Sequence, residues 1–349
     1  MGLDGVRPDD LLPILAIILV VIVIALGDVF NSLLPSRAIP APEEYTYISA
    51  SNPDKPKALP SLGDTPSVKV SIIVPAFDET ARLKPMIEST LEHLRSLSPH
   101  RSFEIIVVDD GSKDDTTGLA LKLSIAHAKE NAKDEIRVVR LMTNRGKGGA
   151  VKHGCMHSRG ERILFVDADG ATRFSDLEAL WKTMDELEEK EEGGPCIVIG
   201  SRAHLVNSEA VVKRSKIRNF LMKGFHTTLR VLGVGYIGDT QCGFKVSHIP
   251  SEDVCLMTDN GTPLQLFNRA AAQQVFPPLH LPTWIFDVEL LLLAQFLRIP
   301  VLEIPVHWHE VPGSKLNIAG ASFSMLRDLI LLRVNYLFGR WTPQDFRED

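Results

Sequence analysis

Short apolar runs rich in β-branched residues alternate along the chain with stretches of helical periodicity, starting near residue 68. Each run has the length of a buried strand, about four to eight residues. The helical stretches repeat their apolar positions every three or four residues; the clearest lies at 83–94, and residues 115–130 suit a second helix. Strands that alternate with helices predict an α/β fold, in which a mostly parallel sheet is flanked by helices on both faces. The predicted strands lie at 68–74, 103–112, 136–141, 162–170 and 196–202.

Polar side chains follow four of these predicted strands, at the point where each strand ends. Ligands of such sheets bind at the carboxyl ends of the strands. The sequence therefore predicts one site at that edge. Its candidate residues are Asp78 and Glu79 after the first strand, Asp109 and Asp110 after the second, residues 144–147 after the third, and Asp167 and Asp169 after the fourth.

Asp167 and Asp169 lie in the segment FVDADGAT (165–172), directly after a predicted buried strand. Alternate residues of an extended backbone point in opposite directions, so a turn must bring the two carboxylates together. Carboxylate oxygens suit Mg²⁺ or Mn²⁺, which can bridge to substrate phosphates. Asp167 and Asp169 are therefore the candidate metal ligands, with an ordinary acidic turn as the alternative.

The segment NRGKGGAVKHG (144–154) is glycine-rich and basic, but it lacks the glycine spacing and the Ser or Thr of a Walker A loop. Because it precedes a helix, its backbone N–H groups and Lys147 can meet an anion such as a donor phosphate. The alternative is a glycine turn with surface lysines. Asp109 and Asp110 can accept hydrogen bonds from a ribose or a base, or cap the following helix.

Residues 11–26 form an apolar run, LLPILAIILVVIVIAL, which Val29 and Phe30 extend. Together these residues approach the roughly 20 that span a bilayer. We predict a retained membrane anchor over residues 1–34. A cleaved signal peptide and a buried core helix are the alternatives, although no good cleavage site follows the run.

Two further segments flank the globular part. Residues 35–67 contain seven prolines and predict a linker, so that the globular part begins near Val68. Residues 323–338, FSMLRDLILLRVNYLF, are mostly apolar, but interrupting charges make a membrane span costly. They predict an amphipathic helix at a membrane surface within a C-terminal segment 323–349; a core helix is the alternative.

Composition limits the partners and the compartment. In 349 residues, 44% are hydrophobic and 23% charged, which is enough for a packed core. The formal net charge of -6 argues against a nucleic-acid partner. The four cysteines form no CxxC pair, so their spacing offers no zinc site, and they are too few for a disulfide framework.

Several segments resemble the motifs of the inverting family-2 glycosyltransferases, which have the Rossmann-like GT-A fold. They are PAFDE at 75–79, VVDDGSKDDT at 107–116, NRGKGGAV at 144–151 and VDADGAT at 166–172. Four later motifs look like the dolichyl-phosphate β-glucosyltransferase branch of that family: GSR at 200–202, DTQCGFK at 239–245, WIFDVELL at 284–291 and HEVPGSKLN at 309–317. The resemblance covers roughly residues 68–340 and implies a GT-A catalytic domain over 68–322.

The resemblance implies a hexosyltransferase that moves glucose from UDP-glucose to dolichyl phosphate with inversion and requires Mg²⁺ or Mn²⁺. It places the enzyme in the endoplasmic reticulum membrane, in contact with membrane lipid. The chain would cross that membrane once and keep its catalytic domain in the cytosol. The reaction that the resemblance implies would serve protein N-glycosylation.

The resemblance also implies roles for individual residues. The uridine would be held by Pro75, Phe77, Glu79 and Asp110. The metal and diphosphate would be bound by Asp167 and Asp169, the phosphates by Arg202 and Lys245, and the sugar by Gln241. Asp287 would be the acid near the acceptor. The resemblance thus gives three catalytic candidates: Asp169, Asp287 and Arg202. In the last motif, Ser314 and Lys315 are placed to contact an anion.

One segment departs from the family pattern. Residues 246–265 (VSHIPSEDVCLMTDNGTPLQ) intervene where the family's sequence runs directly into one like LFNRAAAQ. They show no clear periodicity. Two interpretations stay open: an intron translated in frame, or a genuine insertion near the acceptor side, which would put the function of Lys245 in doubt.

Three other functions compete with this one. A dolichyl-phosphate mannosyltransferase would use GDP-mannose as the donor. An inactive nucleotide-sugar-binding homologue would not need intact Asp167 and Asp169. A processive polysaccharide synthase would need several spanning helices and a QxxRW-type acceptor motif, and the sequence shows neither.

Overall fold

The structure is a computed structural model, and it describes residues 40–128, 135–201, 264–309, 311 and 318–344. All of them belong to one unit, Ala38–Asp349. The strands are β1 (Thr46–Ser49), β2 (Lys57–Ala58), β3 (Val68–Ala76), β4 (Phe103–Asp109), β5 (Glu135–Arg140), β6 (Gly160–Val166), β7 (Ile197–Ser201), β8 (Leu264–Asn268) and β9 (Val301–Pro305). The helices are η1 (Pro42–Tyr45) and η2 (Phe174–Asp176), both 3₁₀, and α2 (Leu83–Ser96), α3 (Thr116–His127), α4 (Lys147–Met156), α5 (Leu177–Lys190), α7 (Arg269–Val275), α8 (Phe286–Phe296) and α9 (Ile318–Leu337).

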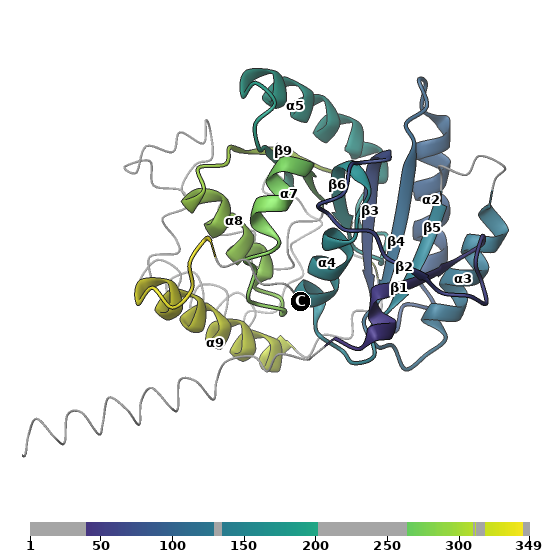
Figure 1. Cartoon of the computed structure of the whole chain (residues 1–349), viewed down its shortest axis with the longest axis horizontal. Helices are drawn as coiled ribbons and strands as arrows, with labels where there is room; N and C mark the ends of the chain where they lie inside the picture. Colours follow the sequence, from purple (N-terminus) through teal and green to yellow (C-terminus); the bar gives the residue numbers. More distant parts are fainter. Residues whose placement is uncertain (1–39, 129–134, 202–263, 310, 312–317, 345–349) are drawn as a thin grey trace, which may run out of the picture. The chain divides into compact units, whose positions relative to one another are not determined.

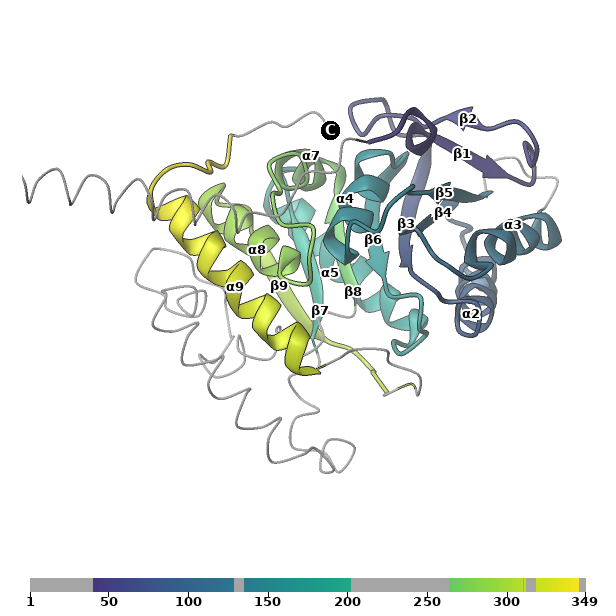
Figure 2. The same ribbon diagram turned by 90° about the horizontal axis from the view of Figure 1, so that it is seen from below.

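The described strands form one sheet in the order β2-β1-β5-β4-β3-β6-β8-β7-β9 (Figure 2). Its centre, β5-β4-β3-β6, is parallel, as the sequence predicts. The flanks are mixed, because β8 pairs antiparallel with β6 and β7, and β1 pairs antiparallel with β5. The prediction of an α/β sheet with a parallel core is confirmed, whereas the flanks are not mostly parallel.

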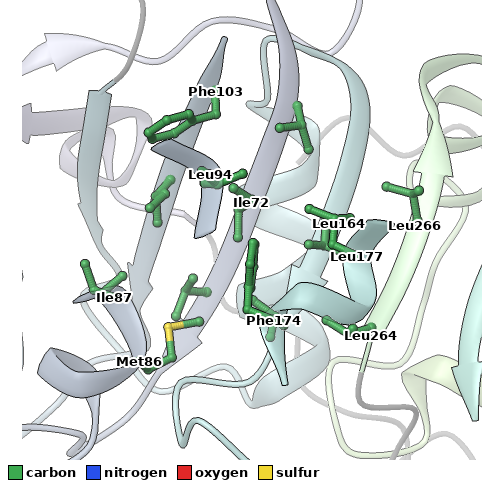
Figure 3. Close-up of a cluster of buried hydrophobic side chains, with 14 of the residues drawn as sticks. Ile72, Met86, Ile87, Leu94, Phe103, Leu164, Phe174, Leu177, Leu264 and Leu266 are labelled. Carbon is green, nitrogen blue, oxygen red and sulfur yellow. The ribbon is translucent and has the colours of Figure 1, made fainter. Parts of the chain in front are cut away.

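Apolar side chains are buried on both faces of the sheet. On the face shown in Figure 3, strand residues Ile72 and Leu164 belong to one cluster with Met86, Ile87 and Leu177 of α2 and α5. The opposite face buries residues of α4, α7 and α8. Since a buried Leu or Ile side chain contributes about 1.5–3 kcal/mol, these two clusters are the main source of stability.

The helices and strands predicted from the clearest sequence patterns are present in the structure. The predicted helix at 83–94 is α2, whose predicted apolar positions are all buried. The second predicted helix, at 115–130, is α3. The five predicted strands are β3, β4, β5, β6 and β7, each shifted by a few residues at its ends.

The region predicted as a linker is partly folded. η1, β1 and β2 lie within residues 35–67, and β1 pairs with β5. Tyr47 of β1 is buried, and the guanidinium of Arg137 lies 4.3 Å from its ring centre. The linker prediction is therefore wrong for residues 42–58, because strands of two and four residues are too short to show a period among prolines.

The end of the predicted insertion also belongs to the sheet. β8 begins at Leu264, so Leu264 and Gln265 pair with Val166 and Phe165 of β6. The last two residues of the predicted insertion are therefore part of the sheet, and the insertion itself stays a prediction. Residues 246–263 lie outside the described part of the chain.

The C-terminal helix α9 runs alongside α8 in both views (Figure 1 and Figure 2). Leu329 and Leu332 of α9 are buried, whereas Ile330 and Leu337 are exposed, so both a core face and a surface face are present. Among the described residues, no helix has the length and apolar character needed to cross a bilayer. The predicted anchor over 1–34 lies outside them.

Candidate active site

The predicted convergence of strand ends is present in the parallel centre of the sheet. The register pairs Ala76 at the end of β3 with Asp109 at the end of β4, and Asp109 with Arg140 at the end of β5. β6, which also pairs with β3, ends at Val166, directly before Asp167. The polar segments after these strands therefore leave the sheet at the same edge.

Lys147 lies at the centre of a group of acids at this edge. Its Nζ is 2.6 Å from Oδ1 of Asp167, and both side chains are mostly shielded from solvent. The same Nζ lies 5.5 Å from the ring centre of Trp284 and 5.9 Å from that of Phe165. The ammonium group is thus held between a carboxylate and two aromatic rings, within the range of a cation–π attraction.

The turn that the sequence requires between Asp167 and Asp169 is present. Gly170 has a φ of 71°, which a glycine adopts without strain. Oδ1 of Asp169 accepts a hydrogen bond of 2.9 Å from the N–H of Ala171. Burial, and next the charge of Asp167, raise the pKa of Asp169 above its usual value. The two carboxylates therefore repel each other across the turn.

This pair fits a divalent cation. Both side chains offer hard oxygens, and a cation beside them would relieve the repulsion that raises the pKa of Asp169. Within the described residues, no group of three or more His, Cys, Asp or Glu side chains is arranged to hold a metal. A metal here would take its other ligands from substrate phosphates and water, which is the usual coordination of protein-bound Mg²⁺.

Asp287 joins the group from the first turn of α8. Its side chain is buried, and Oδ1 accepts a hydrogen bond of 2.8 Å from the N–H of Val288. Burial raises the pKa of Asp287 to about 7, although the charge of Lys147 opposes the shift. The structure therefore brings together Lys147, Asp167, Asp169 and Asp287, four of the residues that the sequence singles out.

Asp109 and Asp110 point to different partners. Asp109 accepts hydrogen bonds from the N–H of Ser112, at 2.8 Å, and from the hydroxyl of Thr117, so it organises the start of α3. Asp110 accepts from the N–H groups of Arg145 and Gly146, at 2.7 and 2.9 Å. Burial raises the pKa of Asp110 to about 7 in spite of these hydrogen bonds. A role of either acid in binding the uridine stays a prediction.

The first predicted donor-binding motif lies after β3. The carboxylate of Glu79 forms an ion pair with Arg82, whose Nε is 2.7 Å from Oε2. The charges of Asp169 and Asp167 also act on Arg82, which no sequence motif singled out; its signal is a lone arginine three residues after Glu79. Phe77 is 38% exposed and so is open to a ligand.

The start of the motif HEVPGSKLN (309–317) lies against the turn that carries Asp167 and Asp169. His309 donates its backbone N–H to the carbonyl oxygen of Ala171 at 3.0 Å, and Thr172 forms a β-bridge with Trp308. The backbone of His309 thus supports the turn. Five predicted site residues lie outside the part of the chain that the structure describes: Arg202, Gln241, Lys245, Ser314 and Lys315.

Comparisons with known proteins agree on one group. The model of the family "Glycosyl transferase family 2" matches residues 71–230. The dolichyl-phosphate beta-glucosyltransferase of Saccharomyces cerevisiae is 43% identical over 86% of this chain and 86% of the relative. The mouse protein of the same name is 41% identical over 88% of this chain and 87% of the relative.

Among solved structures, one similar chain is glucosyl-3-phosphoglycerate synthase from Mycobacterium tuberculosis in complex with uridine diphosphate. It is 19% identical and covers 77% of this chain and 80% of its own length, with a TM-score of 0.45. The similarity to the yeast and mouse proteins extends over most of this chain and most of each relative, so these two comparisons are the ones that bear on function.

Proposed function

The chain belongs to the dolichyl-phosphate beta-glucosyltransferases of glycosyl transferase family 2, so glucosyl transfer to dolichyl phosphate is its reaction, and we propose that UDP-glucose is the donor. The observation that carries the assignment is the similarity to these relatives over most of the chain. The same relatives argue against an inactive homologue.

We further propose that Asp167 and Asp169 hold Mg²⁺ or Mn²⁺ against the donor diphosphate. Bound there, the cation would stabilise the charge that develops on the leaving UDP. The repulsion between the two carboxylates supports this proposal, since it is relieved by a positive charge. Lys147, 2.6 Å from Asp167, supplies a second positive charge at the same place.

The transfer itself is a single displacement. The bond between the anomeric carbon and the UDP oxygen breaks as a phosphate oxygen of the acceptor forms a new bond, which inverts the configuration. The acceptor phosphate is already anionic at neutral pH, so it needs no strong general base. The task of the protein is therefore to hold two anionic partners together, which favours the cationic groups of the site, Lys147 and Arg82.

Asp287 has a supporting role in this proposal. It is buried beside Lys147, and a full negative charge there is disfavoured until the pH approaches 7. A carboxyl group of this kind can orient Lys147 or the acceptor phosphate without removing a proton. Its position at the start of α8 fixes it relative to the sheet edge.

The acceptor lipid implies a membrane location. We propose a single N-terminal span within residues 1–34, with the catalytic domain on the cytosolic face of the endoplasmic reticulum. The apolar run 11–26 and the lipid-soluble acceptor support this proposal. The exposed apolar residues of α9, Ile330 and Leu337, are suited to a lipid surface.

The donor is tested by product formation in membranes from cells that express the full chain. Labelled UDP-glucose and labelled GDP-mannose are each incubated with dolichyl phosphate, and lipid-extractable label is counted. We expect a glucosyl lipid from UDP-glucose and background from GDP-mannose. Transfer from GDP-mannose alone would assign the chain to the mannosyl reaction instead.

A further inference from the structure

Residues 280–284, in the loop between α7 and α8, contact the active site on one side. The carbonyl oxygen of Pro282 accepts a hydrogen bond of 3.0 Å from the N–H of Gly149. A Cβ on Gly146 would lie only 2.6 Å from that oxygen, so the glycine-rich turn packs directly on this loop. Lys147 emerges from the same turn, and the ring of Trp284 lies beside its Nζ. The loop therefore forms one wall around Lys147.

The other side of the loop is tied to the C-terminal helix. The hydroxyl of Thr283 donates a hydrogen bond of 2.7 Å to Oδ2 of Asp328 in α9. Asp328 is fully buried, and its other oxygen accepts hydrogen bonds of 2.8 and 2.7 Å from the guanidinium of Arg327. A buried carboxylate needs such partners, so the geometry of this contact is strongly constrained.

A second tie holds the start of the same loop. The buried carboxylate of Glu289 accepts hydrogen bonds from the N–H groups of His280 and Leu281, at 3.0 and 2.7 Å. The hydroxyl of Tyr336 in α9 lies 3.2 Å from the same carboxylate. The ring of His280 stacks on Trp341 with centroids 4.1 Å apart. Both ends of the loop are thus fixed to α9 or to the residues that follow it.

We propose that Thr283 and Asp328 are positioning residues for glucosyl transfer: their hydrogen bond makes α9 the outer support of the loop that holds Lys147 against Asp167. Their effect passes through Trp284 and Pro282 to Lys147. Because α9 also carries the exposed apolar residues Ile330 and Leu337, a shift of this helix at a lipid surface would reach the reaction centre.

This inference rests on the proposed function, and it is tested by steady-state kinetics of the full chain with UDP-glucose and dolichyl phosphate. Thr283→Val removes the hydroxyl and keeps the shape of the side chain. We expect kcat to fall about tenfold, since misplacement of a catalytic group by about 1 Å can reduce a rate by one to two orders of magnitude. Thr283→Ser restores the hydroxyl and is expected to retain most of kcat. Ser96→Ala, which removes a hydroxyl–carbonyl hydrogen bond at the end of α2, is the control.

A double-substitution cycle separates positioning from general stability. In a Lys147→Met background, Thr283→Val is expected to change kcat less than twofold, because its effect passes through Lys147. A full tenfold effect in that background, or unchanged kcat of the single variant, would overturn the proposal. If thermal unfolding shows no folded state for Thr283→Val, the variant with the smaller side chain, Thr283→Ala, is used instead. Absence of glucosyl transfer by the wild type would contradict the proposed function. The ratio of variant kcat to wild-type kcat tests this inference alone, so the two outcomes can be told apart.

Discussion

At the scale of single residues, the positive charge of Lys147 is shared by several acids. Its Nζ contacts Asp167 directly, and its charge opposes the raised pKa values of Asp169 and Asp287. Three carboxyl groups around one ammonium group leave an excess of negative charge. That excess is the physical reason to expect a divalent cation at this turn.

Asp169 and Asp287 are expected to differ in importance. Asp169→Ala removes a proposed metal ligand and is expected to lower kcat/KM by about 10²-fold to 10³-fold. This is the range for loss of one preorganised charge-stabilising group. Asp287→Ala is expected to lower it by about tenfold, because the phosphate acceptor needs no strong base. Initial rates of both purified variants decide this, with thermal unfolding as the control for folding. The reverse order would mean that the acceptor-side acid is the essential group.

The titration of Asp110 predicts a pH-dependent stability. Its pKa is 3.8 unperturbed and about 7 in the folded protein, so the folded state favours the protonated acid. This contribution is complete below about pH 4 and is lost as the pH rises to 7. The unfolding free energy of the wild type relative to Asp110→Asn is therefore expected to fall by about 3 kcal/mol between pH 5 and pH 8, because the two pH units between 5 and 7 each contribute about 1.36 kcal/mol. Urea unfolding at both pH values measures it; a constant difference would mean that Asp110 is ionised throughout.

Much of this site was open to prediction from residue type and spacing. Asp167, Asp169 and Lys147 were found because they follow apolar runs whose ends meet at one edge of a parallel sheet. Arg82 was not found, because its position depends on how α2 starts. The roles of Thr283, Asp328 and Glu289 depend on contacts between distant helices, which no local pattern records.

At the scale of elements, contacts of η1 stabilise the glycine-rich turn that precedes Lys147. Glu44 of η1 is buried; it accepts a hydrogen bond of 2.7 Å from the N–H of Met142 and pairs with the guanidinium of Arg145. The backbone of Arg145 in turn donates to Asp110. A segment that reads as a linker thus helps to set the turn that precedes Lys147.

Glu44→Ala is expected to destabilise the fold by about 3 kcal/mol, since loss of one partner leaves a buried charge without compensation. Glu43→Ala, in the same 3₁₀ helix but exposed, is the matched control and is expected to change stability by less than about 0.5 kcal/mol. Thermal or denaturant unfolding compares the two. Equal effects would show that residues 42–45 do behave as a linker.

Three strands that the sequence pattern did not predict, β1, β2 and β8, share a physical cause. The apolar residues of α2 repeat along one face of the helix, and the central strand β4 is one continuous apolar run. Such patterns can be recognised in the sequence alone. β1, β2 and β8 have two to five residues and pair antiparallel, β1 with β5 and β8 with β6 and β7. Their stability comes from partners far away in the sequence, and a local pattern cannot show such partners.

At the scale of the whole molecule, the two ends of the chain are proposed to meet lipid in different ways. The run 11–26 is proposed to span the bilayer, and α9 exposes apolar side chains on one face only. A chain that lacks residues 1–37 is expected to leave the membrane pellet after an alkaline wash, whereas the full chain is expected to stay. Immunoblots of pellet and supernatant measure this, and retention of the shortened chain would contradict the anchor.

The central claim is that Asp167 and Asp169 hold a divalent cation against the diphosphate of UDP-glucose. The most direct test is the rate of glucosyl transfer to dolichyl phosphate by the purified full chain, first treated with EDTA and then titrated with Mg²⁺ or Mn²⁺. The account predicts loss of turnover in EDTA and its recovery with either cation, but no recovery in Asp169→Ala. Undiminished turnover in metal-free buffer would contradict it.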